Sequence, residues 1–334
     1  MKRLAALVAA VGMVLGALWV RGLIEGDDGG SDSDQLRVRC STDLRDLCRE
    51  LAADRDGIEV DVEDPGDTAD ALVELPDGED PGFDVWLADA AWPAVVADTR
   101  KFNRTNGEVL GEPSAVLARS PVVLGVRSRP PSQVTEACGE AVDWRCVGAA
   151  VRAGTSLGMP SPDRGDGLVV LAGAVTDWFA SDDLAADELA VNDFDDPGFS
   201  AWFDAVSAPV RGPGLGDLTP LEAGVTTQGR FAVVGALEAD LVSLPRSRGV
   251  YDAIYPEPVV TADLVLVPAA GFSADSALGR LGGSTRVGQV LAQAGWRVQG
   301  QDLPEGANAD VALPEGQGTP SPGVLQALRD RWED

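Results

Sequence analysis

The order of apolar and polar residues predicts alternating strands and helices from residue 36 onward. Residues 36–40 and 58–63 alternate between apolar and polar side chains, which is the period of a β-strand. Between them, "STDLRDLCRELAADRDG" repeats apolar residues three or four positions apart and ends in glycine, which predicts a helix. A short helix is expected over 67–75, and strands over 83–89 and 120–128. This alternation indicates an α/β fold with a parallel sheet that helices cover on both faces.

The second half of the chain continues with strands and helices and then becomes rich in proline and glycine. The expected elements are a helix within 130–154; a short strand, a polar turn and a long apolar helix within 155–180; a turn and a helix within 217–245; strands within 249–258 and 259–271; a helix broken by Gly-Gly-Ser within 273–296; and a last helix over 324–334. Residues 302–323 have the composition of an irregular surface segment.

The N-terminus carries an apolar run behind two basic residues. Residues 4–20 contain no charge and follow Lys2 and Arg3, but no small-x-small cleavage site comes after them. We expect a transmembrane signal anchor over residues 1–25, a flexible acidic spacer over 26–35, and a body outside the cell membrane. Secretion after cleavage of a signal peptide is the alternative.

The composition excludes several classes of function. With 26 Lys and Arg against 54 Asp and Glu, the formal net charge is -28, which would repel nucleic acid and anionic lipid. The chain has no histidine, so it can form neither a Ser–His–Asp triad nor a histidine-based zinc site. The acidic segment 193–204 lacks the closing glutamate of a calcium loop. No metal site, cofactor or enzymatic activity is expected.

The four cysteines fit an oxidising compartment outside the cytoplasm. Cys40 and Cys48 are eight residues apart, and so are Cys138 and Cys146. Residues at this spacing on one helix would lie about 12 Å apart, too far for a disulfide, so each bonded pair must straddle a bend. We expect the pairs Cys40–Cys48 and Cys138–Cys146, and two pairs of buried free thiols are the alternative.

Several short motifs occur in an order that is typical of one family. They are "DVWLADAAW" (84–92), "SPVVLGV" (120–126), "LGMPSPDRGDG" (157–167), "AIYPEPVVTADLVLV" (253–267), "GQVLAQAGWR" (288–297) and Trp332. In this order they resemble the type II periplasmic-binding-protein fold and, more narrowly, the extracellular solute-binding modules of actinobacterial type. Larger members of that group often continue into a von Willebrand A domain. The resemblance covers about residues 36–334.

The resemblance implies two α/β lobes that are joined by two crossovers and hold a ligand between them. Carried over to this chain, lobe 1 comprises residues 36–128 and 259–334, and lobe 2 comprises residues 129–258. It further implies a monomer that closes on a small-molecule solute and serves a membrane permease or another membrane-bound partner.

Two segments of lobe 1 supply candidate ligand-binding residues. Ser41 and Thr42 lie at a helix start, where they could hold an anion or could simply cap the helix. Asp89 and Trp92 follow a buried strand, where the acid could accept hydrogen bonds and the indole could wall the ligand. The alternative is that Asp89 caps the following turn and Trp92 packs inside lobe 1. Ser120, the first residue of the "SPVVLGV" motif, is a further candidate ligand-binding residue of lobe 1.

In lobe 2, the turn 161–167 contributes Arg164, Asp166 and Gly167, which precede a long apolar helix. Relatives often carry a serine-rich turn here, whereas this chain has Asp163 and Asp166 around Arg164. The two carboxylates would repel an oxyanion unless Arg164 neutralises them, which favours a neutral or cationic solute.

The remaining candidates are Thr226 and Thr227, at an expected helix start, and Tyr255, at an expected strand end. Helix capping and hinge packing are their structural alternatives. Together the observations favour a membrane-tethered extracellular solute-binding protein, serving an uptake system of the ABC type. A sensor or interaction module that retains the same fold without transport is the alternative.

Overall fold

The computed structural model describes residues 35–53, 55–105, 107–139, 141–208, 215, 218–227, 229–244 and 249–333. The predicted anchor (1–25) and all of the predicted spacer except Gln35 lie outside the described residues. Within the ranges that the structure describes, no helix is both long enough and apolar enough to cross a membrane.

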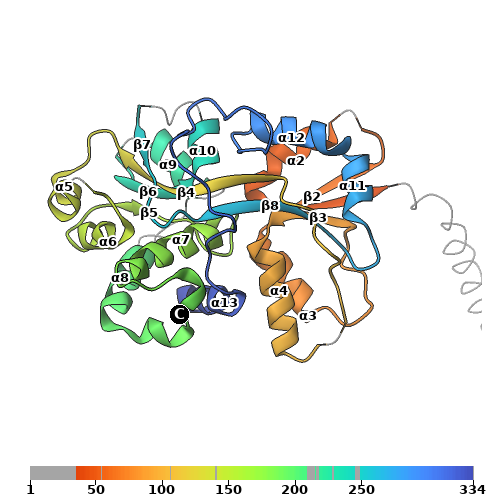
Figure 1. The fold of residues 1–334 in the computed structure, drawn as a ribbon, viewed down its shortest axis with the longest axis horizontal. Coiled ribbons are helices and arrows are strands. Elements are labelled where there is room, and N and C mark those ends of the chain that lie inside the picture. Colours follow the sequence, from red (N-terminus) through yellow and green to blue (C-terminus); the bar gives the residue numbers. More distant parts are fainter. Residues whose placement is uncertain are drawn as a thin grey trace, which may run out of the picture.

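Figure 1 shows two α/β halves that share one mixed sheet. The half drawn on the right contains most of lobe 1. Its elements are β1 (Leu36–Ser41), the 3-10 helix η2 (Thr42–Leu44), α2 (Arg45–Ala52), β2 (Ile58–Glu63), α3 (Pro65–Glu74), β3 (Val85–Asp89), α4 (Ala91–Phe102), β8 (Thr261–Pro268), α11 (Ala274–Arg280) and α12 (Gly283–Gln293).

The half drawn on the left contains lobe 2. Its elements are α5 (Ser132–Cys138), α6 (Trp144–Arg152), β5 (Leu157–Gly158), α7 (Gly167–Ala180), the 3-10 helices η3 (Ala186–Glu188) and η4 (Val191–Asp195), α8 (Pro197–Ser207), α9 (Pro220–Thr226), β6 (Val233–Leu237), α10 (Glu238–Ser243) and β7 (Tyr251–Ile254). Two elements belong to neither half alone, the long strand β4 (Ala118–Arg127) and the last helix α13 (Pro322–Glu333).

The strand β4 carries the sheet from one lobe into the other. Residues 118–121 pair with β8, and residues 122–127 pair with β6 and β7. The chain crosses back between β7 and β8, and the tail then returns along both lobes, since Arg297 bridges to Arg119 of lobe 1 and pairs with Glu238 of lobe 2. Strand pairing is therefore continuous across the two lobes.

The sheet is mixed, whereas the sequence predicted a parallel one. Its strand order is β2-β1-β3-β8-β4-β6-β5, with β7 paired to β4. The pairs β1–β2, β1–β3 and β5–β6 are parallel, but every pairing of β4 and β8 is antiparallel. The expectation of parallel strands failed at β8, because this strand enters from lobe 2 and inserts between β3 and β4 in the opposite direction.

Helices cover both faces of the sheet, as the alternation predicted. In Figure 1, α2, α9, α10 and α12 lie above it, and α3, α4, α7, α8 and α13 lie below it. All residues of β3 and β8 are buried, and both strands contain an apolar run, over residues 85–88 and 264–267. Strand β6 lies inside the segment 217–245, where the sequence predicted only a turn and a helix.

Both predicted disulfides are confirmed. Cys40–Cys48 joins the end of β1 to α2, with the Cα atoms 6.6 Å apart. Cys138–Cys146 joins the end of α5 to the first turn of α6, with the Cα atoms 5.0 Å apart. Each bond straddles a bend in the chain, as the spacing of eight residues required.

Candidate functional site

The loop after β1 in lobe 1 meets the turn before α7 in lobe 2. A Cβ atom on Gly165 would lie 3.0 Å from the Cβ atom of Asp43, so glycine is the residue that permits this approach. Beside it, the backbone N–H of Gly66 donates to the carbonyl of Asp163 at 3.0 Å. The Nε atom of Arg164 lies 3.2 Å from Oδ2 of Asp64. The predicted segments 41–43 and 161–167 therefore come together, although they are far apart in the sequence.

Three carboxyl groups from both lobes gather at this junction. Asp43 comes from lobe 1, whereas Asp166 and Asp240 come from lobe 2 and are hydrogen-bonded to each other. A bond between two carboxyl groups requires that one of them carries a proton. No ion pair joins any of the three to an Arg or Lys within the described ranges. Among the described residues, the junction thus gathers carboxyl groups that no basic side chain pairs with.

The pKa values of all three carboxyl groups are raised, chiefly by burial. The surrounding protein displaces bulk water and, together with the charge of Asp240, raises the pKa of Asp43 to about 7, although the side chain keeps access to solvent. The same burial, with the charges of Asp240 and Asp43, raises the pKa of Asp166 well above its usual range. Burial raises the pKa of Asp240 to about 6. A cation placed among the three groups would stabilise their ionised forms.

Ser41 and Thr42 lie in the loop that carries Asp43. Ser41 is 2 % exposed, and its Oγ atom has no hydrogen-bond partner among the described residues. Thr42 is only partly buried, and its hydroxyl donates to Oδ1 of Asp64 at 2.5 Å. Neither side chain caps the following helix, which was their structural alternative.

Asp89 is the last residue of β3 and Trp92 lies in the first turn of α4, and both make structural contacts. Asp89 accepts hydrogen bonds from the backbone N–H groups of Ala91 (2.8 Å) and Asp263 (2.7 Å) and from the side-chain amide of Gln317 (3.0 Å). Burial raises its pKa to about 7. Trp92 is 1 % exposed and packs inside lobe 1. These contacts match the structural alternative for both residues and do not present the indole to the junction with lobe 2.

Ser120 and Tyr255 hold the connection between the lobes. The Oγ atom of Ser120 accepts the backbone N–H of Ala239 at 2.9 Å. The hydroxyl of Tyr255 donates to Oε1 of Glu238 at 2.5 Å, and Glu238 is paired with the buried Arg297. For Tyr255 this agrees with hinge packing, the alternative that the sequence left open.

Thr226 and Thr227 do not start a helix, so that prediction was wrong. Thr226 is the last residue of α9, and its hydroxyl donates to the carbonyl of Glu222 at 2.7 Å. Thr227 follows the helix with extended backbone angles. The helix begins instead at Pro220, where Thr219 and Glu222 form a capping box.

Comparison with known proteins gives a fold. No protein-family model matches the chain, and no curated protein matches it. Among solved structures, the periplasmic binding protein AfuA from Actinobacillus pleuropneumoniae, with exogenous fructose-6-phosphate bound, superposes with a TM-score of 0.61 at 12% identity, over 89% of this chain and 97% of that one. Apo ferric ion-binding protein A from Pasteurella haemolytica superposes with a TM-score of 0.51 at 10% identity, over 90% and 95% of the two chains. This chain has the periplasmic-binding-protein fold.

Identities this low show the fold and not the ligand. Within the periplasmic-binding-protein fold, the residues that sequence reasoning missed are Asp43 and Asp240. Asp43 is the third residue of the quoted segment "STDLRDLCRELAADRDG", so its position after a strand was the available signal. Asp240 lies in α10 directly after β6, and the unrecognised strand concealed it.

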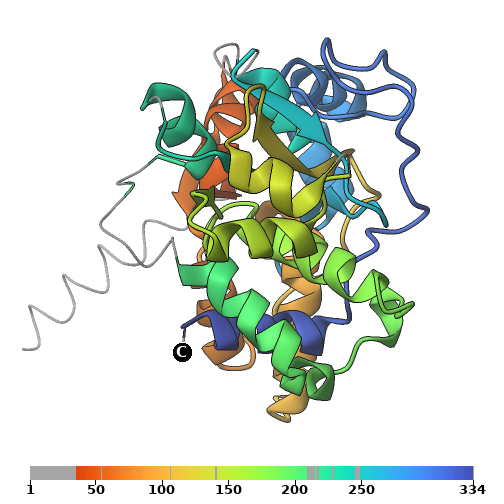
Figure 2. The ribbon, with the colours of Figure 1, turned by 90° about the vertical axis from the view of Figure 1, so that its left-hand side faces the viewer.

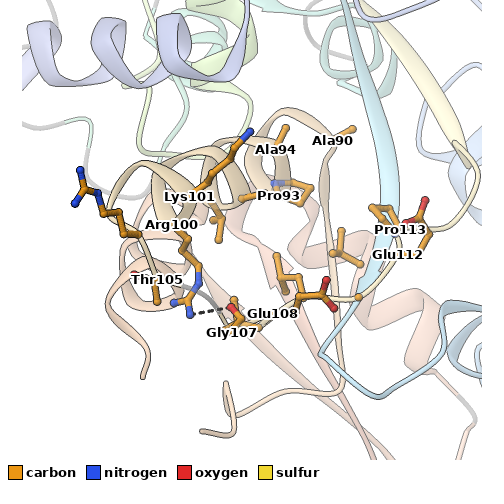
Figure 3. A pocket seen from close by; sticks show the side chains of 17 residues that line it. Ala90, Pro93, Ala94, Arg100, Lys101, Thr105, Gly107, Glu108, Glu112 and Pro113 are labelled. Atoms are coloured by element: carbon orange, nitrogen blue, oxygen red, sulfur yellow. Dashed lines mark hydrogen bonds between the residues drawn. The ribbon is translucent and has the colours of Figure 1, made fainter. Parts of the chain in front are cut away.

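A groove of about 640 Å³ lies elsewhere in lobe 1, along one face of α4 (Figure 3). Apolar residues such as Pro93 and Leu110 line it together with five charged side chains, which are Arg100, Lys101, Arg104, Glu108 and Glu112. None of the ligand-binding residues predicted from the sequence lines this groove. Its neighbourhood includes Phe102, which is 85% exposed at the end of α4.

Proposed function

We propose that this chain binds a small solute between its two lobes and that the solute carries a positively charged group. The fold supports the first part, because binding proteins of this fold hold their ligand between two lobes. One observation carries the second part: Asp43 of lobe 1 faces Asp166 and Asp240 of lobe 2, and none of the three forms an ion pair with an Arg or Lys of the described residues.

The charge of the junction decides between ligand classes. A free oxyanion would have to approach three carboxyl groups, whereas an ammonium or guanidinium group would be attracted by them and could donate hydrogen bonds to them. Closure of the lobes would bring the carboxyl groups of both around the cation, so each lobe alone would bind more weakly than the closed pair. In this proposal the protein is a binding protein and not an enzyme.

The wider setting is an extracellular body that is tethered to the cell membrane by its N-terminus and delivers its solute to an uptake system of the ABC type. The apolar run at residues 4–20 and the two disulfides support that compartment. Isolation of the protein with or without its leader, from membranes or from the medium, tests the tether.

Ligand-dependent thermal shift tests the proposed function. The panel pairs each cation with a neutral or anionic partner of similar size, such as spermidine with a diol, choline with a neutral alcohol, and arginine with citrulline, and adds sulfate and phosphate. A solute at 100 times its dissociation constant should add about 2.7 kcal/mol to the free energy of unfolding. Stabilisation by anions alone would contradict the assignment of a cation.

Two matched variants locate the effect. Asp240→Asn removes one carboxylate from the junction and should reduce stabilisation by the cation. Asp46→Asn removes a carboxylate whose side chain is 96% exposed on α2, and should leave the shift unchanged. If both variants respond alike, the cation binds outside the junction.

A second candidate function, an interaction module without transport, has one observation in its favour. Phe102 is 85% exposed at the end of α4, between Lys101 and Arg104, which have no ion-pair partner in the part of the chain that the structure describes. An exposed aromatic residue between free cations is typical of a surface that contacts an acidic protein. An adjacent permease and ATPase in the gene neighbourhood would favour uptake, and adjacent secretion or cell-wall genes would favour the interaction module.

A further inference from the structure

The last helix, α13, lies between the two lobes. In Figure 1 and in the perpendicular view of Figure 2, it lies between α8 of lobe 2 and α4 of lobe 1. It packs against α4 on one side and against α7 and η4 on the other. Although α13 belongs to lobe 1 by sequence, it touches both lobes.

Arg329 of α13 binds a carboxylate of each lobe at once. Its two terminal nitrogens donate to the two carboxylate oxygens of Asp70 in α3, both at 2.7 Å. Its Nε atom donates to Oδ1 of Asp163, in the turn before α7. The guanidinium also lies over the ring of Trp92, 5.5 Å from the ring centroid. With only 6% of the side chain exposed, the guanidinium is held by lobe 1 and lobe 2 together.

The end of α13 is anchored on lobe 2 independently of Arg329. Arg331 donates to the carbonyl of Phe194 and to the hydroxyl of Ser200, both at 2.9 Å. Trp332 meets the ring of Phe203 edge-on, with the centroids 6.1 Å apart. If the lobes separate along this side, Arg329 must release Asp70 when the helix stays with lobe 2, or Asp163 when it stays with lobe 1.

The charges at the junction oppose closure, and Arg329 offsets part of that repulsion. Asp43, Asp64 and Asp70 of lobe 1 face Asp163, Asp166 and Asp240 of lobe 2. Arg329 and Arg164 form the ion pairs of the described residues that lie among these carboxylates, and a further pair between the lobes, Arg297 with Glu238, lies beside the crossover. Without a guanidinium between them, the facing carboxylates would push the lobes apart.

We propose that α13 is a clasp that holds the two lobes together without a ligand, and that Arg329 is the residue that fastens it. This inference goes beyond the proposed function and does not depend on which solute binds. Opening of the lobes then requires release of Arg329 from Asp70 or from Asp163, so the clasp sets how often the junction opens.

A distance measurement between the lobes tests the clasp. Spin labels are placed on Glu79→Cys in lobe 1 and Asp204→Cys in α8 of lobe 2, both exposed positions, and distances are measured by double electron–electron resonance without added solute. All four native cysteines are in disulfides, so only the introduced thiols are labelled. With Arg329 present, one short distance should dominate.

Arg329→Ala should raise the population of a longer distance at least about tenfold, because two charge-assisted contacts are lost. Asp163→Asn, which loosens only the contact with lobe 2, should produce a smaller increase and keeps the test available if Arg329→Ala does not fold. Arg329→Lys keeps the charge but loses the bidentate contact with Asp70. Its population of the longer distance should therefore lie between that of the wild type and that of Arg329→Ala.

The control is Arg100→Ala, which removes a buried arginine whose hydrogen bonds all lie within lobe 1. It should lower stability without changing the distance. The proposal is overturned if the distance distributions of Arg329→Ala and Asp163→Asn match the wild type. The two proposals fail in different experiments. If the clasp does not exist, cations should still stabilise the protein in the thermal-shift assay. If the proposed function is wrong, cations give no thermal shift, but the distances between the spin labels still respond to Arg329→Ala.

Discussion

The buried ion pair between Arg297 and Glu238 gives the sharpest stability prediction. Glu238 is 1% exposed and Arg297 is 9% exposed. Arg297 donates to the two carboxylate oxygens at 2.6 and 2.7 Å and to the carbonyls of Val311 and Asn308, both at 2.9 Å. The pair therefore ties the returning tail to α10 beside the crossover between the lobes.

Arg297→Met removes the countercharge and leaves Glu238 buried, with only neutral donors from Tyr255 and Asn308. Removal of one partner of a buried pair costs about 3–5 kcal/mol, because the other charge stays desolvated. The double variant Arg297→Met with Glu238→Gln removes both charges, so its cost should be smaller than the sum of the two single costs by about 1–3 kcal/mol.

Urea denaturation followed by tryptophan fluorescence, with the disulfides intact, measures these free energies. The control is Arg49→Met, which breaks an exposed pair with Asp46 and should cost less than about 1 kcal/mol. The reasoning is refuted if Arg297→Met costs no more than this control, or if the costs of Arg297→Met and Glu238→Gln simply add.

Three further predictions concern the disulfide, the packing and the titration of the core. Replacing Cys40 and Cys48 by serine should lower the free energy of unfolding by about 2–3 kcal/mol, from urea titration under non-reducing conditions, since the bond closes a short loop; no loss would contradict this. Gly148→Ala should cost about 1–3 kcal/mol in the same titration, because the new Cβ would lie 2.1 Å from Cδ1 of Trp202; a neutral result would show that the indole can move. Burial raises the pKa of Asp177 to about 7, so its contribution to stability is complete below about pH 4 and is lost as the pH rises through 7. Asp177→Asn should therefore flatten the decline in the urea midpoint between pH 5 and pH 8, and an unchanged slope would assign that decline to other groups.

Local sequence patterns predicted most of the elements, because burial imposes a period of two on a half-covered strand and of about 3.6 on a helix. The strand β6 was not predicted, because a short apolar run such as "FAVVGAL" is compatible with a buried strand and with a buried helix. Thr226 and Thr227 were misplaced for a related reason. Threonines favour helix starts, but here Thr219 already supplied the cap seven residues earlier.

The sequence by itself determined the alternation of strands and helices, the acidity, the absence of histidine and the spacing of the cysteines, because each of these follows from neighbouring residues or from composition. Only the tertiary structure decided the antiparallel insertion of β8, the meeting of Asp43 with Asp166 and Asp240, and the position of Arg329 between Asp70 and Asp163. These contacts join residues that lie about a hundred or more positions apart, and no local period encodes which distant segments the burial of apolar surface will bring together.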